Sequence, residues 1–322
     1  MNGSRILTLG SAYMDVHIPG FPFDEHGLLP ETETIGGDYG MTPGGSAVNF
    51  ARVCTQLGLS ATFVGKTGND VFGQLLAQKL REEGVAPELI ADASVSTNIG
   101  VNAINENGHT IMLVAGTANR ALHADEVVGK VLSLLESVDY LYLGGCFKLK
   151  KLMPAFEQLA ERAEQKNVKI VVDHGRVPKN ATAEDKANVR SLVARADYYF
   201  PSQGEFMELW HASDVEAGLR RFTAKAGGTI AVKCASDGAY SVLNGDIVHV
   251  PAFHVTPHNT AGAGDTFNAG FIAARHEGFA LRKSLEFACA VAALKISRDT
   301  LPSRADVDAF LAQRPDVFTP AS

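Results

Sequence analysis

The residues best suited to chemistry lie in one stretch near the C-terminus, Asn259-Thr260-Ala261-Gly262-Ala263-Gly264-Asp265. Its two glycines let successive backbone N–H groups turn toward one point without a clash from a Cβ atom. A helical pattern follows over Thr266–Glu277, so these groups would stand at a positively polarised helix N-terminus. Such a turn can hold a phosphoryl group in transit, while Asp265 takes a proton from an attacking alcohol. A plain helix N-cap explains the same residues, so the stretch alone leaves both interpretations open.

A second glycine-rich stretch occurs early in the chain, at Thr42-Pro43-Gly44-Gly45-Ser46-Ala47-Val48-Asn49. Its Pro-Gly-Gly turn leads into a helical pattern over Val48–Leu57. Gly44 and Gly45 allow the backbone to approach a ligand closely, and the Asn49 amide can donate and accept at sugar hydroxyls. Taken alone, the stretch is equally typical of an ordinary turn from a loop into a helix.

An alternation of short apolar strands and helical patterns must position these two stretches. Such alternation predicts an α/β fold, with a three-layer α/β/α core around a mostly parallel sheet. Asp173 follows one of the strands, at the carboxyl edge where sheets of this kind bind ligands, although loop polarity also explains it. The strand-like runs are Ile6–Leu9, Ala61–Val64, Tyr140–Leu143, Lys169–Val172, Tyr198–Phe200 and Thr229–Cys234.

Two stretches interrupt the alternation. Residues 13–40 contain three prolines, several glycines and no helical period. Residues 97–114 contain two strand-like runs, Ile99–Ile104 and Thr110–Val114, around an Asn-Gly turn that favours a hairpin. We expect these two pieces to form a small β-sheet lid. The α/β core would then consist of residues 1–12, 41–96 and 115–322.

The composition excludes several classes of protein. The 322 residues carry 29 Lys and Arg against 36 Asp and Glu, and this net charge of −7 argues against a nucleic-acid-coating surface. No apolar run approaches the roughly 18 residues of a membrane span. The N-terminus does not resemble a secretory signal, so we expect a cytoplasmic protein. Four widely spaced cysteines, Cys54, Cys146, Cys234 and Cys289, argue against a zinc site or a disulfide framework.

Occurring together and in this order, the two glycine-rich stretches resemble those of the ribokinase-like (PfkB) carbohydrate kinase family. That family carries an early Gly-Gly-x-x-x-Asn element and a late D-T-x-G-A-G-D element. The likeness covers nearly the whole chain. Its further elements are Gly10–Asp15, the lid strands over 97–114, Gly116-Thr117-Ala118-Asn119, Pro201-Ser202-Gln203-Gly204-Glu205 and Val232–Ala239.

The resemblance implies an ATP-dependent kinase that transfers the γ-phosphoryl group to a hydroxymethyl group of a sugar, with a lid closing over the sugar. It implies Asp265 as the base and the amides of Ala263, Gly264 and Asp265 as an anion hole, with Gly262 shaping the turn. Mg²⁺ would neutralise the ATP oxygens, and Glu205 would help to place it through water. The implied acceptor-binding residues are Asp15, Gly44, Gly45 and Asn49, and the implied nucleotide-binding residues are Lys233, Ser236, Gly238 and Cys289.

Several positions depart from the family pattern. Asn259 and Ala261 replace an Asp and a Thr of the monovalent-cation site, and the loop after Ser297 is short, so we expect no activation by potassium. Ser202 replaces the Asn of the N-x-x-E element, and Cys289 also fits a small core thiol. A nucleoside kinase of the same family and a non-catalytic sugar-binding protein stay open as alternatives. Open lid edges commonly pair in this family, so we expect a homodimer through the lid.

Overall fold

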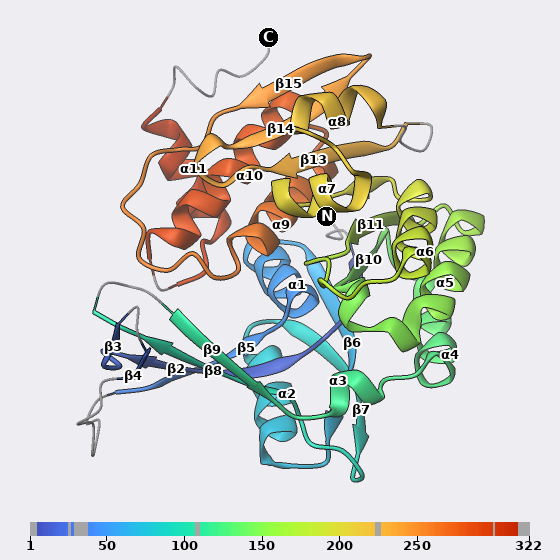
Figure 1. The fold of residues 1–322 in the computed structure, drawn as a ribbon, viewed down its shortest axis with the longest axis vertical. Helices are drawn as coiled ribbons and strands as arrows, with labels where there is room; N and C mark the ends of the chain where they lie inside the picture. The colour runs from blue at the N-terminus through green and yellow to red at the C-terminus, as the bar shows by residue number, and fades with distance from the viewer. Residues whose placement is uncertain are drawn as a thin grey trace.

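A wide sheet forms the centre of the molecule (Figure 1). The computed structural model describes residues 5–24, 27–28, 38–106, 110–222, 227–298 and 300–314. Within them the sheet has nine strands, parallel from β7 to β13 and antiparallel at β14 and β15, so the predicted mostly parallel sheet is confirmed. In spatial order the strands are β7 (Val85–Asp92), β6 (Ser60–Gly68), β1 (Arg5–Leu9), β10 (Tyr140–Gly144), β11 (Lys169–Asp173), β12 (Tyr198–Tyr199), β13 (Thr229–Lys233), β14 (Ala239–Leu243) and β15 (Asp246–Val250).

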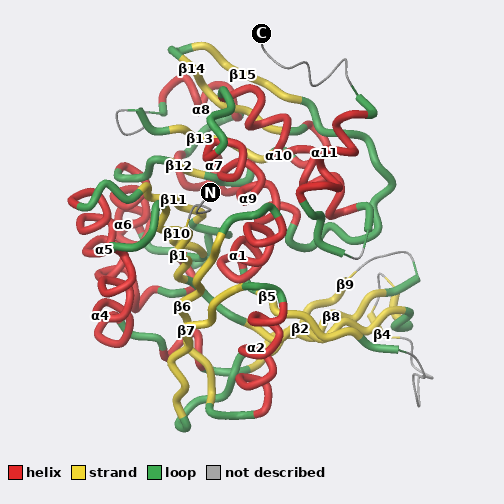
Figure 2. The backbone as a smooth tube through the Cα atoms, turned by 180° about the vertical axis from the view of Figure 1, so that it is seen from behind, coloured by secondary structure: helices red, strands yellow, loops and turns green. Residues whose placement is uncertain are grey.

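Helices cover both faces of this sheet and complete three layers (Figure 2). Successive strand residues point to opposite faces, so Ile6 packs in one core cluster while Leu7 packs in the other. One face is covered by α1 (Ser46–Gln56), α2 (Val71–Glu82), α9 (Ala263–His276), α10 (Leu281–Ile296) and α11 (Arg304–Ala312). The other is covered by α4 (Ala124–Leu135), α5 (Met153–Gln165), α6 (Ala183–Ala194), α7 (Gln203–Trp210) and α8 (Val215–Arg221). Among the described helices, none is long and apolar enough to cross a membrane.

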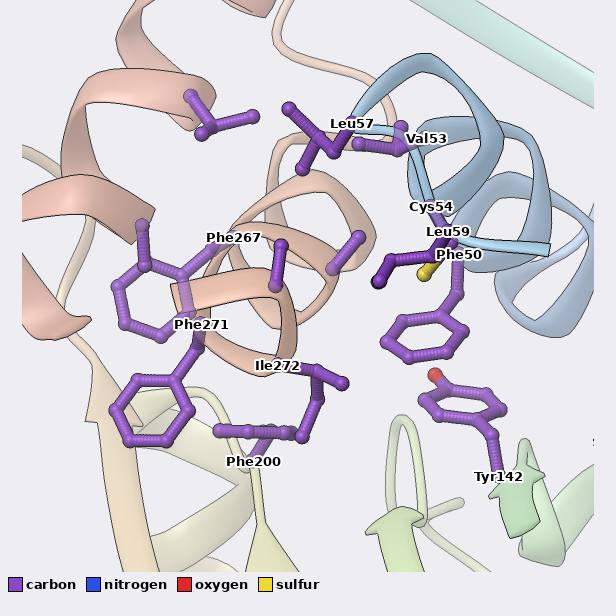
Figure 3. Close-up of a cluster of buried hydrophobic side chains, with 14 of the residues drawn as sticks. Phe50, Val53, Cys54, Leu57, Leu59, Tyr142, Phe200, Phe267, Phe271 and Ile272 are labelled. Carbon is purple, nitrogen blue, oxygen red and sulfur yellow. The ribbon is translucent and has the colours of Figure 1, made fainter. Parts of the chain in front are cut away.

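Aromatic packing fixes α1 and α9 on the sheet. Phe50 of α1 stacks on Tyr142 of β10 with the ring centroids 4.1 Å apart (Figure 3). Phe267 of α9 packs edge-on against Phe200, just beyond β12, with the centroids 6.4 Å apart. All four rings are buried, and such pairs add to the free energy gained from burial. The first turns of α1 and α9 are therefore held in place by the core beneath them.

A smaller sheet projects from the core below α9 and α11 (Figure 1). Its strands, in spatial order, are β5 (Gly40–Gly44), β2 (Tyr13–Pro19), β8 (Ile99–Ile104) and β9 (Thr110–Ala115). The predicted antiparallel pair within 97–114 is confirmed as β8 and β9, while residues 107–109 of the turn lie outside the described residues. The expected core boundary at residue 41 falls inside β5, which pairs with β2 and so belongs to the small sheet. The two-residue strands β3 (Phe23–Asp24) and β4 (Gly27–Leu28) pair beside it.

One side chain ties together the points where the chain passes between the two sheets. Asn119, in the short helix α3 (Ala118–Ala121), accepts from the Ala12 N–H and donates to the Ala12 carbonyl, both at 3.0 Å. Its own N–H donates to Asn98 Oδ1 at 2.8 Å. Ala12 precedes β2 and Asn98 precedes β8, so the Asn119 clasp fixes the base of the small sheet.

Candidate active site

The late glycine-rich stretch forms the N-terminus of α9. Gly262 caps this helix with φ of +76°, a left-handed conformation that favours glycine. The Ala263 N–H donates to the Thr260 carbonyl at 3.2 Å, and Thr266 makes the first bond back to the cap, to the Gly262 carbonyl at 2.9 Å. The first N–H groups of a helix have no acceptor one turn earlier. The amides of Gly264 and Asp265 are therefore the ones best placed to bind an anion.

The carboxylate of Asp265 is held by two side chains from the first turns of α1. Ser46 Oγ donates to Asp265 Oδ1 at 2.6 Å, and Asn49 Nδ2 donates to Asp265 Oδ2 at 2.9 Å. Tyr142 completes the chain of contacts, with its hydroxyl 2.9 Å from Ser46 Oγ. Asn49 was expected at this site, whereas sequence analysis assigned no role to Ser46 or Tyr142. The only signal for Ser46 was its place directly after the Gly44-Gly45 turn.

The environment of Asp265 suits a proton acceptor. Burial raises the pKa of Asp265 to about 6, and the negative charge of Asp173 acts in the same direction. The hydrogen bonds from Ser46 and Asn49 oppose this rise because they stabilise the ionised carboxylate. A carboxylate with a pKa of about 6 is mostly ionised at neutral pH and can still take up a proton.

A second carboxylate, that of Asp15 on β2, fills a space left by two glycines. An ideal Cβ atom on Gly44 would lie 1.9 Å from Asp15 Oδ2, and one on Gly100 would lie 2.3 Å from Asp15 Oδ1. Burial raises the pKa of Asp15 to about 6, against the lowering effect of Arg52 and Lys148. Asp15 Oδ1 is buried and has no hydrogen-bond partner among the described residues. A buried acceptor without a partner costs free energy, so this atom fits a ligand hydroxyl.

Gly45 shapes the entry into α1. Its φ is +105°, and an ideal Cβ atom there would lie 2.2 Å from the Ser11 carbonyl oxygen. No other residue fits this turn, because both the conformation and the space require glycine. The turn sets the direction of α1 and thereby the positions of Ser46 and Asn49.

A cavity of about 1050 Å³ lies between the small sheet and the core. Asp15, Asn49 and Gly262 all line it, so residues expected at the acceptor and phosphoryl sites open onto one space. Arg52 also lines it and forms an ion pair with Glu83. Cavities of this size accommodate a small ligand with room to spare.

Three residues expected at the nucleotide site lie on the connection from β13 to β14. Lys233 ends β13, and Ser236 is exposed in the short helix η3 (Ala235–Asp237). Gly238 has φ of +90°, and an ideal Cβ atom there would lie 2.1 Å from the Val250 carbonyl oxygen, so this connection requires glycine. Ala235, on the same connection, adopts a left-handed φ of +49°.

The fourth expected nucleotide residue, Cys289, lies within α10 and belongs to the buried core. Its side chain is 6% exposed, and burial raises the pKa of the thiol to about 12. A neutral, buried thiol contributes packing rather than polar contacts.

Lys233 belongs to a buried polar network that sequence analysis did not predict. Its Nζ donates to Asp173 Oδ2 at 2.7 Å and to Asn268 Oδ1 at 3.2 Å. Asn268 Nδ2 also donates to Asp173 Oδ2, at 2.7 Å. The network joins β11, β13 and α9 beneath the turn at Gly262–Asp265. Asp173 therefore belongs to a buried network at the carboxyl edge of the sheet, and loop polarity does not explain it.

Glu205, the expected magnesium residue, takes part in the N-terminal cap of α7. Its Oε2 accepts from the Ser202 N–H at 2.8 Å, and Ser202 Oγ accepts from the Glu205 N–H at 3.4 Å. Across the described parts of the chain, no group of three or more His, Cys, Asp or Glu side chains could hold a metal ion. Mg²⁺ on a nucleotide keeps several waters and needs only one or two carboxylates. The single carboxylate of Glu205 fits that limited role.

The segment before the turn carries the departures from the family pattern. Asn259 Oδ1 accepts from the Ala261 N–H at 2.9 Å, so this side chain supports its own loop. Lys295 Nζ lies 3.5 Å from the Asn259 carbonyl oxygen and brings a positive charge to the segment. The nearby Arg298 forms an ion pair with Asp306, with Nη1 and Oδ1 3.0 Å apart.

Comparison with known proteins identifies the family. Residues 5–302 match the model of the pfkB family carbohydrate kinases, and the chain belongs to that family. It is therefore a sugar kinase by class, as the motifs predicted. Ribokinase of Bacillus subtilis (strain 168) is 23% identical over 314 residues, covering 96% of this chain and 99% of the relative.

Solved structures share the fold. An E. coli protein in complex with ATP and Mg²⁺ has a TM-score of 0.81 at 21% identity, covering 97% of this chain and 100% of that chain. Ribokinase of Arabidopsis thaliana, complexed with ribose and ATP, has a TM-score of 0.74 at 22% identity, covering 96% and 99%. The predicted ribokinase-like architecture, a three-layer core with a separate smaller sheet, is confirmed.

Proposed function

We propose that the protein transfers the γ-phosphoryl group of ATP to a hydroxymethyl group of a sugar, with Asp265 as the base. The observation that carries the proposal is the position of the Asp265 carboxylate. It lies in the first turn of α9, held by Ser46 and Asn49. A proton acceptor thus stands beside an anion-binding helix N-terminus, and phosphoryl transfer needs both.

The acceptor sugar would bind in the cavity between the small sheet and the core. Asp15 Oδ1 would accept from one sugar hydroxyl and Asn49 would contact another, while Gly44 and Gly45 would allow the chain to pass close to the ring. The small sheet would act as a lid that excludes water from the reacting atoms. Such closure would limit the wasteful hydrolysis of ATP.

The phosphates would meet the turn at Gly262–Asp265, with the amides of Gly264 and Asp265 donating to oxygens of the transferred group. The nucleotide would extend toward the β13–β14 connection, where Lys233, Ser236 and Gly238 lie. Mg²⁺ supplies charge neutralisation to the phosphate oxygens when bound, and Glu205 would hold one of its waters. Cys289 would contribute only apolar packing near the nucleobase of ATP.

The test is ADP release with a panel of pentoses, hexoses, their monophosphates and nucleosides. Turnover with a sugar or sugar phosphate supports the proposal, and turnover with nucleosides alone supports the nucleoside kinase instead. Sugar binding by calorimetry without ADP release from any acceptor would identify a non-catalytic binding protein. The inactive Asp265→Asn variant, prepared in parallel, controls for contaminating kinases.

We also propose a homodimer formed through the small sheet. β9 is one of its two edge strands, and the consecutive residues Met112, Leu113 and Val114 are 51%, 64% and 54% exposed. An open apolar edge of this kind pairs readily with a second copy. Light scattering after gel filtration should give a dimer for the wild type and a monomer for Leu113→Lys. Leu243→Lys, at a leucine on β14 that is 50% exposed, should stay dimeric. A monomeric wild type would overturn this proposal.

We also propose that the enzyme is cytoplasmic. The four cysteines Cys54, Cys146, Cys234 and Cys289 are buried free thiols, which suits a reducing compartment. Fractionation of cells that express the tagged chain tests this directly, and recovery outside the cytoplasm would contradict it.

A further inference from the structure

The ammonium group of Lys233 lies directly beneath the anion-binding turn. An ideal Cβ atom on Gly264 would be 3.4 Å from Lys233 Nζ. Because Gly264 lacks that atom, nothing of its own side chain separates the ammonium from the backbone of the turn. The Lys233 side chain is 13% exposed, so it is largely sheltered and still reaches the surface of the site.

Two fixed acceptors hold this ammonium in place. Asp173 Oδ2 and Asn268 Oδ1 accept from Lys233 Nζ at 2.7 and 3.2 Å, and both acceptor residues are buried. Asp173 is itself fixed, because its Oδ1 accepts from the Gly175 N–H at 3.0 Å. An ammonium has three N–H donors. Within the described residues two of them have acceptors, which leaves one donor for a ligand.

The charge of Lys233 persists despite its sheltered position. Burial alone would lower the pKa of Lys233, but the carboxylates of Asp173 and Glu205 outweigh burial and raise it above its usual value. The lysine therefore stays protonated at neutral pH. A preorganised positive charge in a sheltered site stabilises a developing negative charge more strongly than the same charge in water.

We propose that Lys233 is a catalytic residue that donates to an oxygen of the phosphoryl group in transit, and does not recognise the nucleoside part of ATP. The inference rests on the proposed kinase function. In the transfer, the acceptor hydroxyl oxygen forms a bond to the γ-phosphorus and its proton passes to Asp265. The bond from that phosphorus to the bridging oxygen breaks, and ADP leaves with the electron pair. Lys233 stays protonated throughout and faces the charge that the transferred group carries.

Nucleotide binding tests this without a known acceptor. We would titrate ADP and the non-hydrolysable β,γ-imido analogue of ATP, each with Mg²⁺, into wild type and Lys233→Met. The variant should bind the imido analogue roughly 10- to 100-fold more weakly, as expected for the loss of a charge-assisted hydrogen bond. Its affinity for ADP should stay within about twofold of the wild-type value, because ADP lacks the γ-phosphoryl group that the lysine contacts.

Lys66→Met is the matched control. Lys66 is a sheltered lysine at 4% side-chain exposure, paired with Asp92 and Glu126, and it takes no part in the site. Its loss should lower the melting temperature and leave both nucleotide affinities unchanged. Lys233→Arg keeps the charge and should recover part of the affinity for the imido analogue.

The outcomes separate the inference from the proposed function. If Lys233→Met weakens the binding of both nucleotides equally, the lysine contacts the nucleoside or the inner phosphates, and the inference is overturned. Unchanged affinity for both would also overturn it. If the wild type binds neither nucleotide, the kinase proposal itself fails.

A second variant covers the case in which Lys233→Met does not fold. Lys233→Gln keeps a hydrogen-bond donor for Asp173 and Asn268 and removes the positive charge. It should weaken binding of the imido analogue selectively, as Lys233→Met should, whereas a lysine with only a structural role predicts wild-type affinity for both nucleotides.

Discussion

Ser46 Oγ donates a hydrogen bond to Asp265 Oδ1 at 2.6 Å, across 219 residues of sequence. Ser46 is the first residue of α1, and Asp265 lies in the first turn of α9. Two helix N-termini therefore converge on one carboxylate, and each adds a partial positive charge to the same small region. That field favours an anion, which is what a phosphoryl group in transit requires.

Replacing Asp265 tests its role as the base. Asp265→Asn keeps the size of the side chain and removes its capacity to accept a proton. We expect kcat to fall roughly 100- to 10,000-fold, the usual contribution of general base catalysis, with ATP binding retained. Asp306→Asn is the control, because Asp306 also caps the first turn of a helix, α11, and lies outside the site. Unchanged phosphorylation by Asp265→Asn would remove the assignment.

The pKa values of the site predict how activity depends on pH. Asp265 must be ionised to act as a base and its pKa is raised to about 6, so kcat should rise with pH through about 6. The bond from Ser46 stabilises the ionised form, so Ser46→Ala should raise the pKa and move the acid limb up by roughly one pH unit.

The control for this shift is Ser133→Ala, an exposed serine of α4 whose profile should match the wild type. Asp15 also has a pKa of about 6, but Ser46 makes no hydrogen bond to it. If the acid limb of the kcat profile does not move in Ser46→Ala, the group that titrates near pH 6 is another one, such as Asp15.

The parts of the fold that could be predicted are those with a local signal, such as a glycine-rich turn or a periodic run of apolar residues. Both glycine-rich stretches lead into helices as expected: Gly45 directly precedes α1 and Gly262 directly precedes α9, each with a positive φ that favours glycine. The alternation of apolar runs also identified the parallel sheet, since buried parallel strands have few polar positions.

The site was less predictable, because its contacts join residues that are distant in the sequence. Lys233, Asp173 and Asn268 meet only when three elements pack together, and no local pattern encodes that meeting. Ser46 carries no signal beyond its place after a turn. Cys289 was assigned to the nucleotide by position in a motif, whereas its burial depends on how α10 packs on the sheet.

Activity should not require potassium. Asn259 is neutral where the family has an acidic residue, and Lys295 Nζ already brings a positive charge within 3.5 Å of the Asn259 carbonyl oxygen. A second cation beside that ammonium would be repelled. We expect kcat in KCl and in choline chloride of equal ionic strength to agree within about twofold, a margin far below the tenfold change that 1.4 kcal/mol of cation binding would give. Activation of tenfold or more by K⁺ would contradict this.

The Asn119 clasp should couple the stability of the protein to acceptor binding. Asn119→Ala removes both side-chain bonds to Ala12 and leaves a buried N–H and a buried carbonyl without partners. Each loss costs about 1–3 kcal/mol, so the free energy of unfolding should fall by about 2–6 kcal/mol. Because the clasp sets the base of the small sheet, KM for the acceptor should rise more than KM for ATP. Urea unfolding and steady-state kinetics measure both effects, with Asn69→Ala, at an exposed asparagine, as the control. Equal changes in the two KM values would show that the clasp acts on stability alone.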